Sequence, residues 1–183
     1  MQSVLDAHPE QIELATMASD IERIVRSGKF SALLTIEGGN QIDDDLRVLR
    51  MCHRLGIRSM TLTHSRNNNW ADSATDKAVH NRLTDFCKDV VREMNRLGML
   101  VDLSHVSDKT FYDALAVTTK PVIVSHSSMR ALSNVPRNVS DEMRRALARN
   151  CSVIGICFGM GFINPKMPRH CTRLRRRSPM IRY

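Results

Sequence analysis

Four apolar runs in this chain each end on an ionisable side chain that could take part in chemistry. The four end residues are Glu37, His64, His105 and His126. Two histidines with one glutamate form a ligand set that holds zinc and leaves one position of the ion open to water. When parallel strands of a barrel deliver such residues at their C-terminal ends, the side chains meet on one rim, where that architecture builds active sites. The pattern predicts a metal-centred enzyme.

Glu37, His105 and His126 are the predicted metal ligands. Each histidine follows a serine at the end of a strand-like run, and Gly38-Gly39 after Glu37 allow a tight turn that keeps the carboxylate accessible. Taken alone, Glu37 could form an ion pair with a neighbouring Arg or Lys, and either histidine could be a structural residue. Because the ends of adjacent parallel strands lie close together, the three residues together favour one shared ion.

Two further positions could serve a substrate. His64 begins the polar stretch 65–72, which is too long for a minimal turn and typical of a binding wall. The imidazole could be a fourth metal ligand, a donor to a developing oxyanion, or a cap for the loop. Arg137, followed by Asn138, lies in the loop that leaves the His126 strand, where a guanidinium could hold a substrate carboxylate in a bidentate pair. Solvation at the surface is the alternative for Arg137.

Strands and helices must alternate to position these residues. The apolar stripe over 83–97, which ends at Gly98, predicts an amphipathic helix. Ser107 and Ser140 are predicted helix N-caps, a helix is expected over 44–55 before Gly56, and one or two more within 9–27. Short apolar runs predict buried parallel strands at 31–36, 57–63, 100–103, 121–125 and 152–158.

Strict alternation with connections of this length is typical of right-handed βαβ units and a parallel sheet. The predicted fold class is α/β, a partial TIM-type (β/α)8 barrel of about five parallel strands alternating with helices. It is incomplete because 183 residues fall short of the roughly 250 that a whole barrel needs. We expect residues 1–165 to form this domain and residues 166–183 to form a basic, disordered tail.

The net charge of +8 belongs to that tail, which holds seven basic residues and no acid and leaves the remainder at about +1. The five cysteines have no paired spacing and are expected to be reduced thiols. The chain shows no signal peptide and no apolar stretch of the roughly 20 residues that span a bilayer. As written it is expected to be cytoplasmic, without a membrane segment.

Five motifs, in this order along the chain, resemble the renal or membrane dipeptidase family of zinc peptidases. They are IEGG (36–39), MTLTH (60–64) with NWAD (69–72), GMLVDLSH (98–105), VSHSS (124–128) and PRNV (136–139). The resemblance implies a (β/α)8 barrel with two zinc ions that hydrolyses dipeptides. It also implies that Glu37 bridges both ions, that His105 and His126 complete the second site, and that His64 is catalytic and holds the oxyanion. Arg137, with Asn138, would then bind the substrate.

The chain departs from the family pattern at both ends, as a truncated chain would. The family's opening strand carries a His-x-Asp pair for the first metal, and nothing before Glu37 supplies it, since His8 is followed by Pro9 and Glu10. The family's later strands are also absent. We therefore expect one zinc at most, and weak or no dipeptidase activity.

Two readings from other classes stand beside the enzyme. A non-catalytic zinc-binding fragment could associate through its open sheet edges, because unpaired strands invite pairing with another chain, and a homodimer is left open. The arginine-rich tail could anchor nucleic acid, but no aromatic residue lies within 173–177 and the rest of the chain is nearly neutral. We expect no nucleic-acid partner. Full-length relatives of the family can be membrane-anchored.

Overall fold

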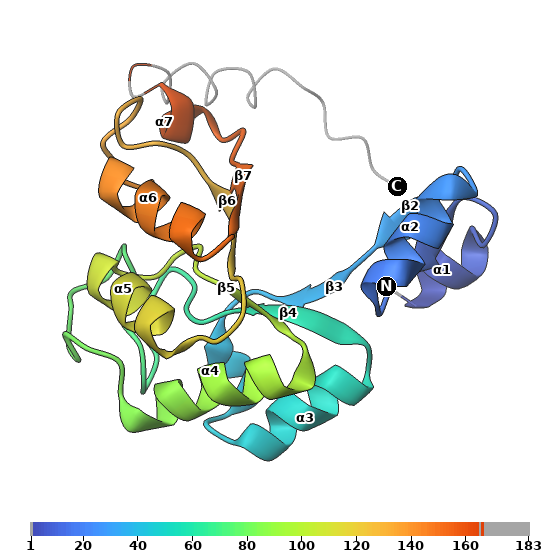
Figure 1. Ribbon diagram of the computed structural model, residues 1–183, viewed down its shortest axis with the longest axis horizontal. Helices are drawn as coiled ribbons and strands as arrows, with labels where there is room; N and C mark the ends of the chain where they lie inside the picture. The colour runs from blue at the N-terminus through green and yellow to red at the C-terminus, as the bar shows by residue number, and fades with distance from the viewer. Residues whose placement is uncertain (1, 165, 167–183) are drawn as a thin grey trace, which may run out of the picture.

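The structure is a computed structural model that describes residues 2–164 and 166 (Figure 1). The predicted tail therefore lies outside the described residues, except for Lys166. Five strands form one sheet, all parallel and in the order of the chain. This confirms the predicted α/β class. The strands are β3 (Leu34–Ile36), β4 (Ile57–Thr61), β5 (Leu100–Asp102), β6 (Ile123–Ser127) and β7 (Val153–Ile156).

One long helix connects each pair of successive strands, as the alternation predicts. The helices are α3 (Leu46–Arg54), α4 (Asp85–Leu97), α5 (Asp108–Val117) and α6 (Asp141–Arg149). The hydroxyls of Thr84, Ser107 and Ser140 accept hydrogen bonds from backbone N–H groups in the first turns of α4, α5 and α6, which satisfies donors that a helix leaves free. Gly98 ends α4 with a φ of 74°, a conformation that glycine adopts without strain.

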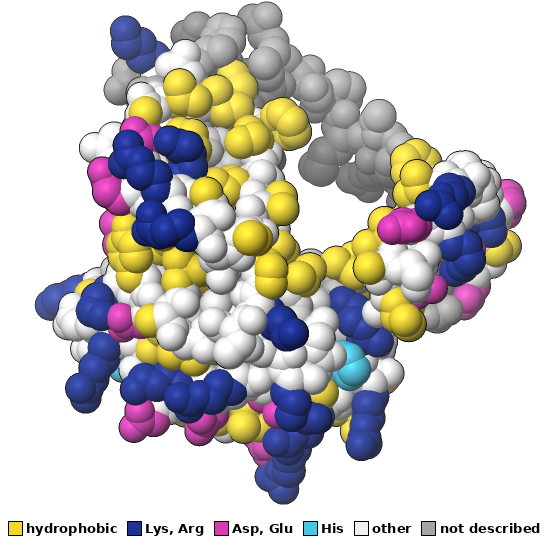
Figure 2. All heavy atoms as spheres, in the orientation of Figure 1, with side chains coloured by type: hydrophobic (Ala, Val, Ile, Leu, Met, Phe, Trp, Pro, Cys, Tyr) yellow, Lys and Arg dark blue, Asp and Glu magenta, His cyan; other side chains and the backbone are white. Residues whose placement is uncertain are grey.

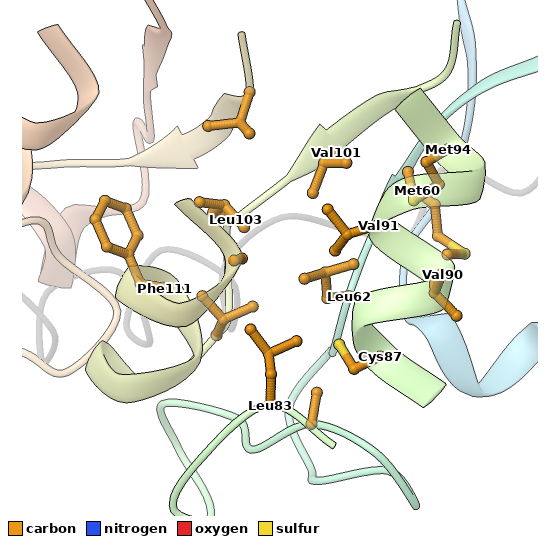
Figure 3. Packing of buried hydrophobic residues seen from close by; sticks show 14 of the residues in the cluster. Met60, Leu62, Leu83, Cys87, Val90, Val91, Met94, Val101, Leu103 and Phe111 are labelled. Atoms are coloured by element: carbon orange, nitrogen blue, oxygen red, sulfur yellow. The ribbon is translucent and has the colours of Figure 1, made fainter. Parts of the chain in front are cut away.

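The core lies between the sheet and these helices. Figure 3 shows Val90, Val91 and Met94 of α4 facing Met60 of β4 and Val101 of β5, and all five side chains are buried. Successive residues of a strand point to opposite faces, so the neighbours of these strand residues point away from the helices. The concave face of the sheet therefore carries a polar set: Thr35, Ser59, Thr61, Asp102 and Ser125.

The N-terminal part differs from the prediction. The expected strand 31–36 is divided at Leu33 into β2 (Phe30–Ala32) and β3, and β2 pairs instead with β1 (Ile12–Leu14). β1 lies inside the region 9–27 that was expected to be helical, so that expectation was wrong there. The remaining elements are α1 (Gln2–Ala7), α2 (Ala18–Arg26), the 3-10 helix η1 (Gly39–Ile42) and α7 (Met160–Ile163).

The sheet is open among the described residues, with β3 and β7 as its edge strands. Its concave face holds a cavity of about 400 Å³. Leu33, Val153 and Ile156 expose much of their apolar surface, and Figure 2 shows hydrophobic side chains gathered along this open side of the molecule. Within the described range, every helix is too short or too polar to cross a membrane.

Candidate metal centre

The C-terminal ends of three strands bring Glu37, His105 and His126 together. The carboxylate Oε1 of Glu37, which directly follows β3, lies 3.0 Å from Nε2 of His105 and 3.1 Å from Nε2 of His126. The two imidazole Nε2 atoms are 2.9 Å apart. His105 follows β5, and His126 lies within β6. Three donor atoms from three strands therefore face one point.

The spacing of these atoms fits a single ion. Ligand atoms at 2.0–2.1 Å from a tetrahedral zinc lie about 3.3 Å from one another, which is close to the three observed separations. Two neutral imidazole nitrogens at 2.9 Å can share only one proton, so a cation between the lone pairs would suit this arrangement better than hydrogen bonds alone. The three residues form a group that could hold a metal ion.

His105 has an unusual backbone. Its φ is +75°, in the left-handed region that few side chains other than Gly, Asn, Asp and His enter. The carbonyl oxygen of His105 accepts hydrogen bonds from the Ala74 N–H (2.7 Å) and the Ser73 hydroxyl (3.3 Å). The long loop between β4 and α4 therefore holds the turn that aims this imidazole. Such strain is characteristic of functional sites.

The electrostatics keep His105 neutral. Burial of the ring, and then the positive charge of Arg137, lower the pKa of His105 to about 4. A neutral imidazole has a lone pair to offer to a metal. Nδ1 of His105 is buried and has no hydrogen-bond partner among the described residues.

Glu37 remains ionised in this setting. Burial opposes the charge of the carboxylate, but the positive charges that His64 and His105 carry when protonated, together with a hydrogen bond from His105, outweigh it and hold the pKa of Glu37 below its usual 4.5. The side chain is 49% exposed and lines the cavity of the concave face. The Gly38 N–H donates to the Thr61 hydroxyl at 2.6 Å, which ties the turn after β3 to the end of β4.

His64 lies beside the three donors without joining them. Its Nε2 is 3.7 Å from Oε1 of Glu37, beyond hydrogen-bond distance, and its ring centroid is 4.5 Å from that of His105. Half of its side chain is exposed. The imidazole is therefore placed next to any group that the three donors would hold, and it is open to solvent.

Arg137 reaches the same rim from the loop after β6. One terminal nitrogen donates to the His126 carbonyl at 3.1 Å, and the guanidinium carbon lies 5.3 Å from the centroid of the Phe162 ring. Nε of Arg137 is buried and has no hydrogen-bond partner in the part of the chain that the structure describes. The guanidinium thus keeps donors available close to His126.

Asn138 has a different environment from the one that a substrate contact would need. Its side chain is 1% exposed, and Nδ2 donates to the carbonyls of Ser133 and Phe162 while Oδ1 accepts from the Ser128 N–H. These contacts hold the loop in which Arg137 lies. The substrate contact of Asn138 stays a prediction, and the observed contacts of its side chain are all with the protein.

Asp102, Ser104 and Ser125 lie within the family motifs 98–105 and 124–128, but no role was predicted for them. Oδ1 of Asp102 accepts from the backbone N–H groups of Ser104 (2.9 Å) and Ser125 (3.1 Å). The signal that could have found Asp102 is a carboxylate inside an apolar strand, since a buried charge needs partners. Asp102 joins the turn that carries His105 to the strand that carries His126.

Two imidazoles and a carboxylate are side chains with which metal-dependent hydrolases hold catalytic zinc, and the C-terminal ends of parallel strands are where barrel enzymes build their active sites. A family model described as membrane dipeptidase (Peptidase family M19) matches residues 1–176. The chain therefore belongs to the membrane dipeptidase family, which confirms the resemblance seen in the sequence.

Two curated relatives are dipeptidases from fungi. The chain is 44% identical to dipeptidase tcpJ of Claviceps purpurea, over 94% of this chain and 40% of the relative. It is 36% identical to dipeptidase ataJ of Aspergillus terreus, over 88% of this chain and 44% of that protein. The chain thus spans less than half the length of these two relatives.

Solved structures share the fold. The probable dipeptidase PvdM from Pseudomonas aeruginosa superposes with a TM-score of 0.84 at 26% identity, over 95% of this chain and 47% of that chain. A metallo peptidase from Rhodobacter sphaeroides, liganded with a phosphinate mimic of the dipeptide L-Ala-D-Ala, gives a TM-score of 0.84 at 22% identity, over 96% and 54%. At that identity the second likeness supports the fold alone.

Proposed function

We propose that this chain carries the His2Glu metal site of a zinc-dependent dipeptidase, with Glu37, His105 and His126 as the ligands. The observation that carries the proposal is the convergence of one carboxylate oxygen and two imidazole nitrogens within 3.1 Å of each other. His2Glu is a ligand set of catalytic zinc in other peptidases. The names of the fungal relatives support dipeptides as the substrate class.

Each remaining residue has a role that its position supports. Bound zinc would supply a Lewis acid at the scissile carbonyl. Arg137, whose Nε has no partner among the described residues, binds the terminal carboxylate of the dipeptide. His64, half exposed beside His105, donates a hydrogen bond to the carbonyl oxygen as negative charge develops there.

We also propose that the chain binds one zinc ion and has low activity by itself. Among the described residues, one group of three or more metal-ligand side chains is close enough to share an ion. The sequence before Glu37 has no His-x-Asp pair to hold a second ion. We further propose that residues 1–165 form one domain and that the chain is located in the cytoplasm.

The experiment measures zinc and activity in the same preparations. The purified chain is dialysed against a weak chelator, zinc is counted by elemental analysis, and Ala-Ala dipeptides of both stereochemistries are tested for hydrolysis. We expect about one zinc per chain, lost in His105→Ala and in His126→Ala. His8→Ala is the control, because His8 is exposed and lies outside the cluster. Zinc that survives both site substitutions would refute the proposed ligands.

The open sheet supports a second candidate, association without catalysis. Leu33 directly precedes the edge strand β3, and Val153 and Ile156 lie in the other edge strand, β7. The exposed fractions of these three residues range from 40% to 67%. Edges and apolar surface of this kind favour pairing with another chain, including a second copy. Sedimentation of the purified chain distinguishes the two candidates: a monomer at all concentrations argues against association.

A further inference from the structure

Ser125 contacts the edge of the His126 ring that lies opposite Nε2, away from Glu37 and His105. Its hydroxyl oxygen lies 2.7 Å from Nδ1 of His126, while Nε2 of the same ring faces Glu37 at 3.1 Å and His105 at 2.9 Å. A neutral imidazole carries one proton, and the partner of one nitrogen decides which nitrogen holds it. The hydroxyl is therefore in a position to set the tautomer of His126.

We infer that Ser125 is a positioning residue that accepts a hydrogen bond from Nδ1–H of His126 and so leaves the Nε2 lone pair facing Glu37 and His105. The opposite tautomer would place a hydrogen on Nε2, between two other donor atoms of the cluster. The inference rests on the proposed function only in treating Nε2 as a metal ligand. Second partners of this kind fix the orientation and tautomer of metal-bound histidines.

Ser125 is itself held in place. Its backbone N–H donates to Oδ1 of Asp102 at 3.1 Å, and the N–H of Ser104 donates to the same oxygen at 2.9 Å. Asp102 is 2% exposed and Ser104 is fully buried. The hydroxyl of Ser125 therefore extends from a backbone that a buried carboxylate has fixed.

The surrounding hydroxyls complete a consistent chain of hydrogen bonds. The oxygens of Ser104 and Ser125 are 3.3 Å apart, and the Ser104 oxygen accepts from the His126 N–H at 3.1 Å. If Ser125 accepts from Nδ1–H, its own hydrogen is free to donate to Ser104, whose oxygen has two lone pairs. The Nδ1 hydrogen of His126 and the hydroxyl hydrogen of Ser125 then both lie on the side of the ring away from Glu37 and His105.

His105 is held by other means. Its Nδ1 has no hydrogen-bond partner among the described residues, and its ring is buried on a left-handed backbone fixed by the loop after β4. Removing the Ser125 hydroxyl is therefore expected to affect His126 and to leave His105 unchanged. This difference allows the role of Ser125 to be tested separately.

The first readout is zinc affinity, measured on the full chain by competition with a chromophoric chelator. We expect Ser125→Ala to bind zinc about 10-fold more weakly than the wild type. Ser125→Thr keeps the hydroxyl and should restore the affinity to within about 2-fold. Ser59→Ala is the matched control, because Ser59 lines the same cavity and its hydroxyl has no hydrogen-bond partner among the described residues.

The second readout is the tautomer of His126 in zinc-free protein, observed by ¹⁵N NMR at a pH where the ring is neutral and assigned with His126→Ala. The wild type and Ser125→Thr should show Nδ1–H, and Ser125→Ala should gain the Nε2–H form. An unchanged tautomer in Ser125→Ala would overturn the inference.

The two readouts separate the inference from the proposed function. If the wild type binds zinc, His126→Ala does not, and Ser125→Ala binds as tightly as the wild type, the inference is wrong and the metal site stands. If the wild type binds no zinc, the proposed function fails, and the tautomer alone decides whether Ser125 positions His126.

Discussion

Gly39 lies directly against the indole ring of Trp70. A Cβ at position 39 would overlap the far edge of that ring and would approach the backbone oxygen of Leu62 to 2.6 Å. Trp70 is 1% exposed, so the ring has no free space into which to move. The contact joins the turn after Glu37 to the loop that carries His64 and supports His105.

Gly39→Ala should therefore destabilise the protein by about 1–3 kcal/mol, the usual cost of overpacking a filled core. Urea unfolding followed by circular dichroism measures the change, and the fluorescence of Trp70, the single tryptophan of the chain, reports any displacement of the loop. Gly161→Ala is the control, because a Cβ there meets nothing within 4 Å. Equal stability of the two variants would contradict this account.

Asp102 should prove important for the junction of β5 and β6. These strands share one paired position, Asp102 with Ile123. The carboxylate of Asp102 also accepts one hydrogen bond from the Ser104 N–H, just after β5, and one from the Ser125 N–H, in β6. Asp102→Ala leaves both donors without this acceptor and should cost about 2–6 kcal/mol at 1–3 kcal/mol for each group. Asp102→Asn keeps a carbonyl oxygen and should lose less. Thermal unfolding ranks the variants, and an order with Asn below Ala would disprove this role.

Glu93 gives a pH-dependent contribution to stability. Hydrogen bonds from Arg96, and then from Arg50, hold the pKa of Glu93 at about 2, below its usual 4.5. Because the folded pKa is the lower one, the stabilisation is complete above pH 4.5 and is lost as the pH falls toward 2. Glu93→Gln should lower the unfolding free energy by roughly 1–2 kcal/mol at pH 7.

The difference between wild type and Glu93→Gln should then shrink at pH 3. Urea titrations at both pH values measure it. Glu22→Gln is the matched control, since Glu22 also pairs with an arginine but its side chain is 68% exposed, and it should have little effect at either pH. A gap for Glu93→Gln that stays constant with pH would count against the role of its ion pairs.

The described cysteines should differ in reactivity. Cys52, Cys87, Cys151 and Cys157 are free thiols, as the sequence predicted, while Cys171 lies outside the described residues. Burial raises the pKa of the Cys87 thiol strongly, whereas Cys151 is exposed. A thiol reagent at neutral pH should label Cys151 within minutes and Cys87 only on unfolding, as mass spectrometry of digested protein would reveal. Early labelling of Cys87 would be inconsistent with the packing of α4.

Local sequence signals were sufficient for much of the fold. The stripe over 83–97 and the hydroxyls of Ser107 and Ser140 predicted α4, α5 and α6 because helix periodicity and caps depend on nearby residues. The break at Leu33 was missed, because it depends on β1, a strand distant in sequence, pairing with β2. A run of apolar residues contains no information on which neighbour it will pair with.

The site shows the same division. The convergence of Glu37, His105 and His126 was predicted because side chains at the ends of parallel strands meet, whatever the details of the loops. The left-handed backbone of His105 and the hydrogen bonds of Asn138 depend on loops that close over the rim, and no local pattern predicts them. The zinc ligand roles and the substrate role of Arg137 remain predictions.

The short pairing between β5 and β6 has a consequence for the whole chain. Glu37 and His105 belong to the β3–β5 side of this junction, and His126 belongs to the β6–β7 side. An ion bound by all three would therefore act as a removable cross-link between the two parts of the sheet. The free concentration of the ion would then determine the stability of this connection. At 100 times the dissociation constant, binding adds about 2.7 kcal/mol to the free energy of unfolding. The mechanical integrity of the sheet would then depend directly on the supply of metal.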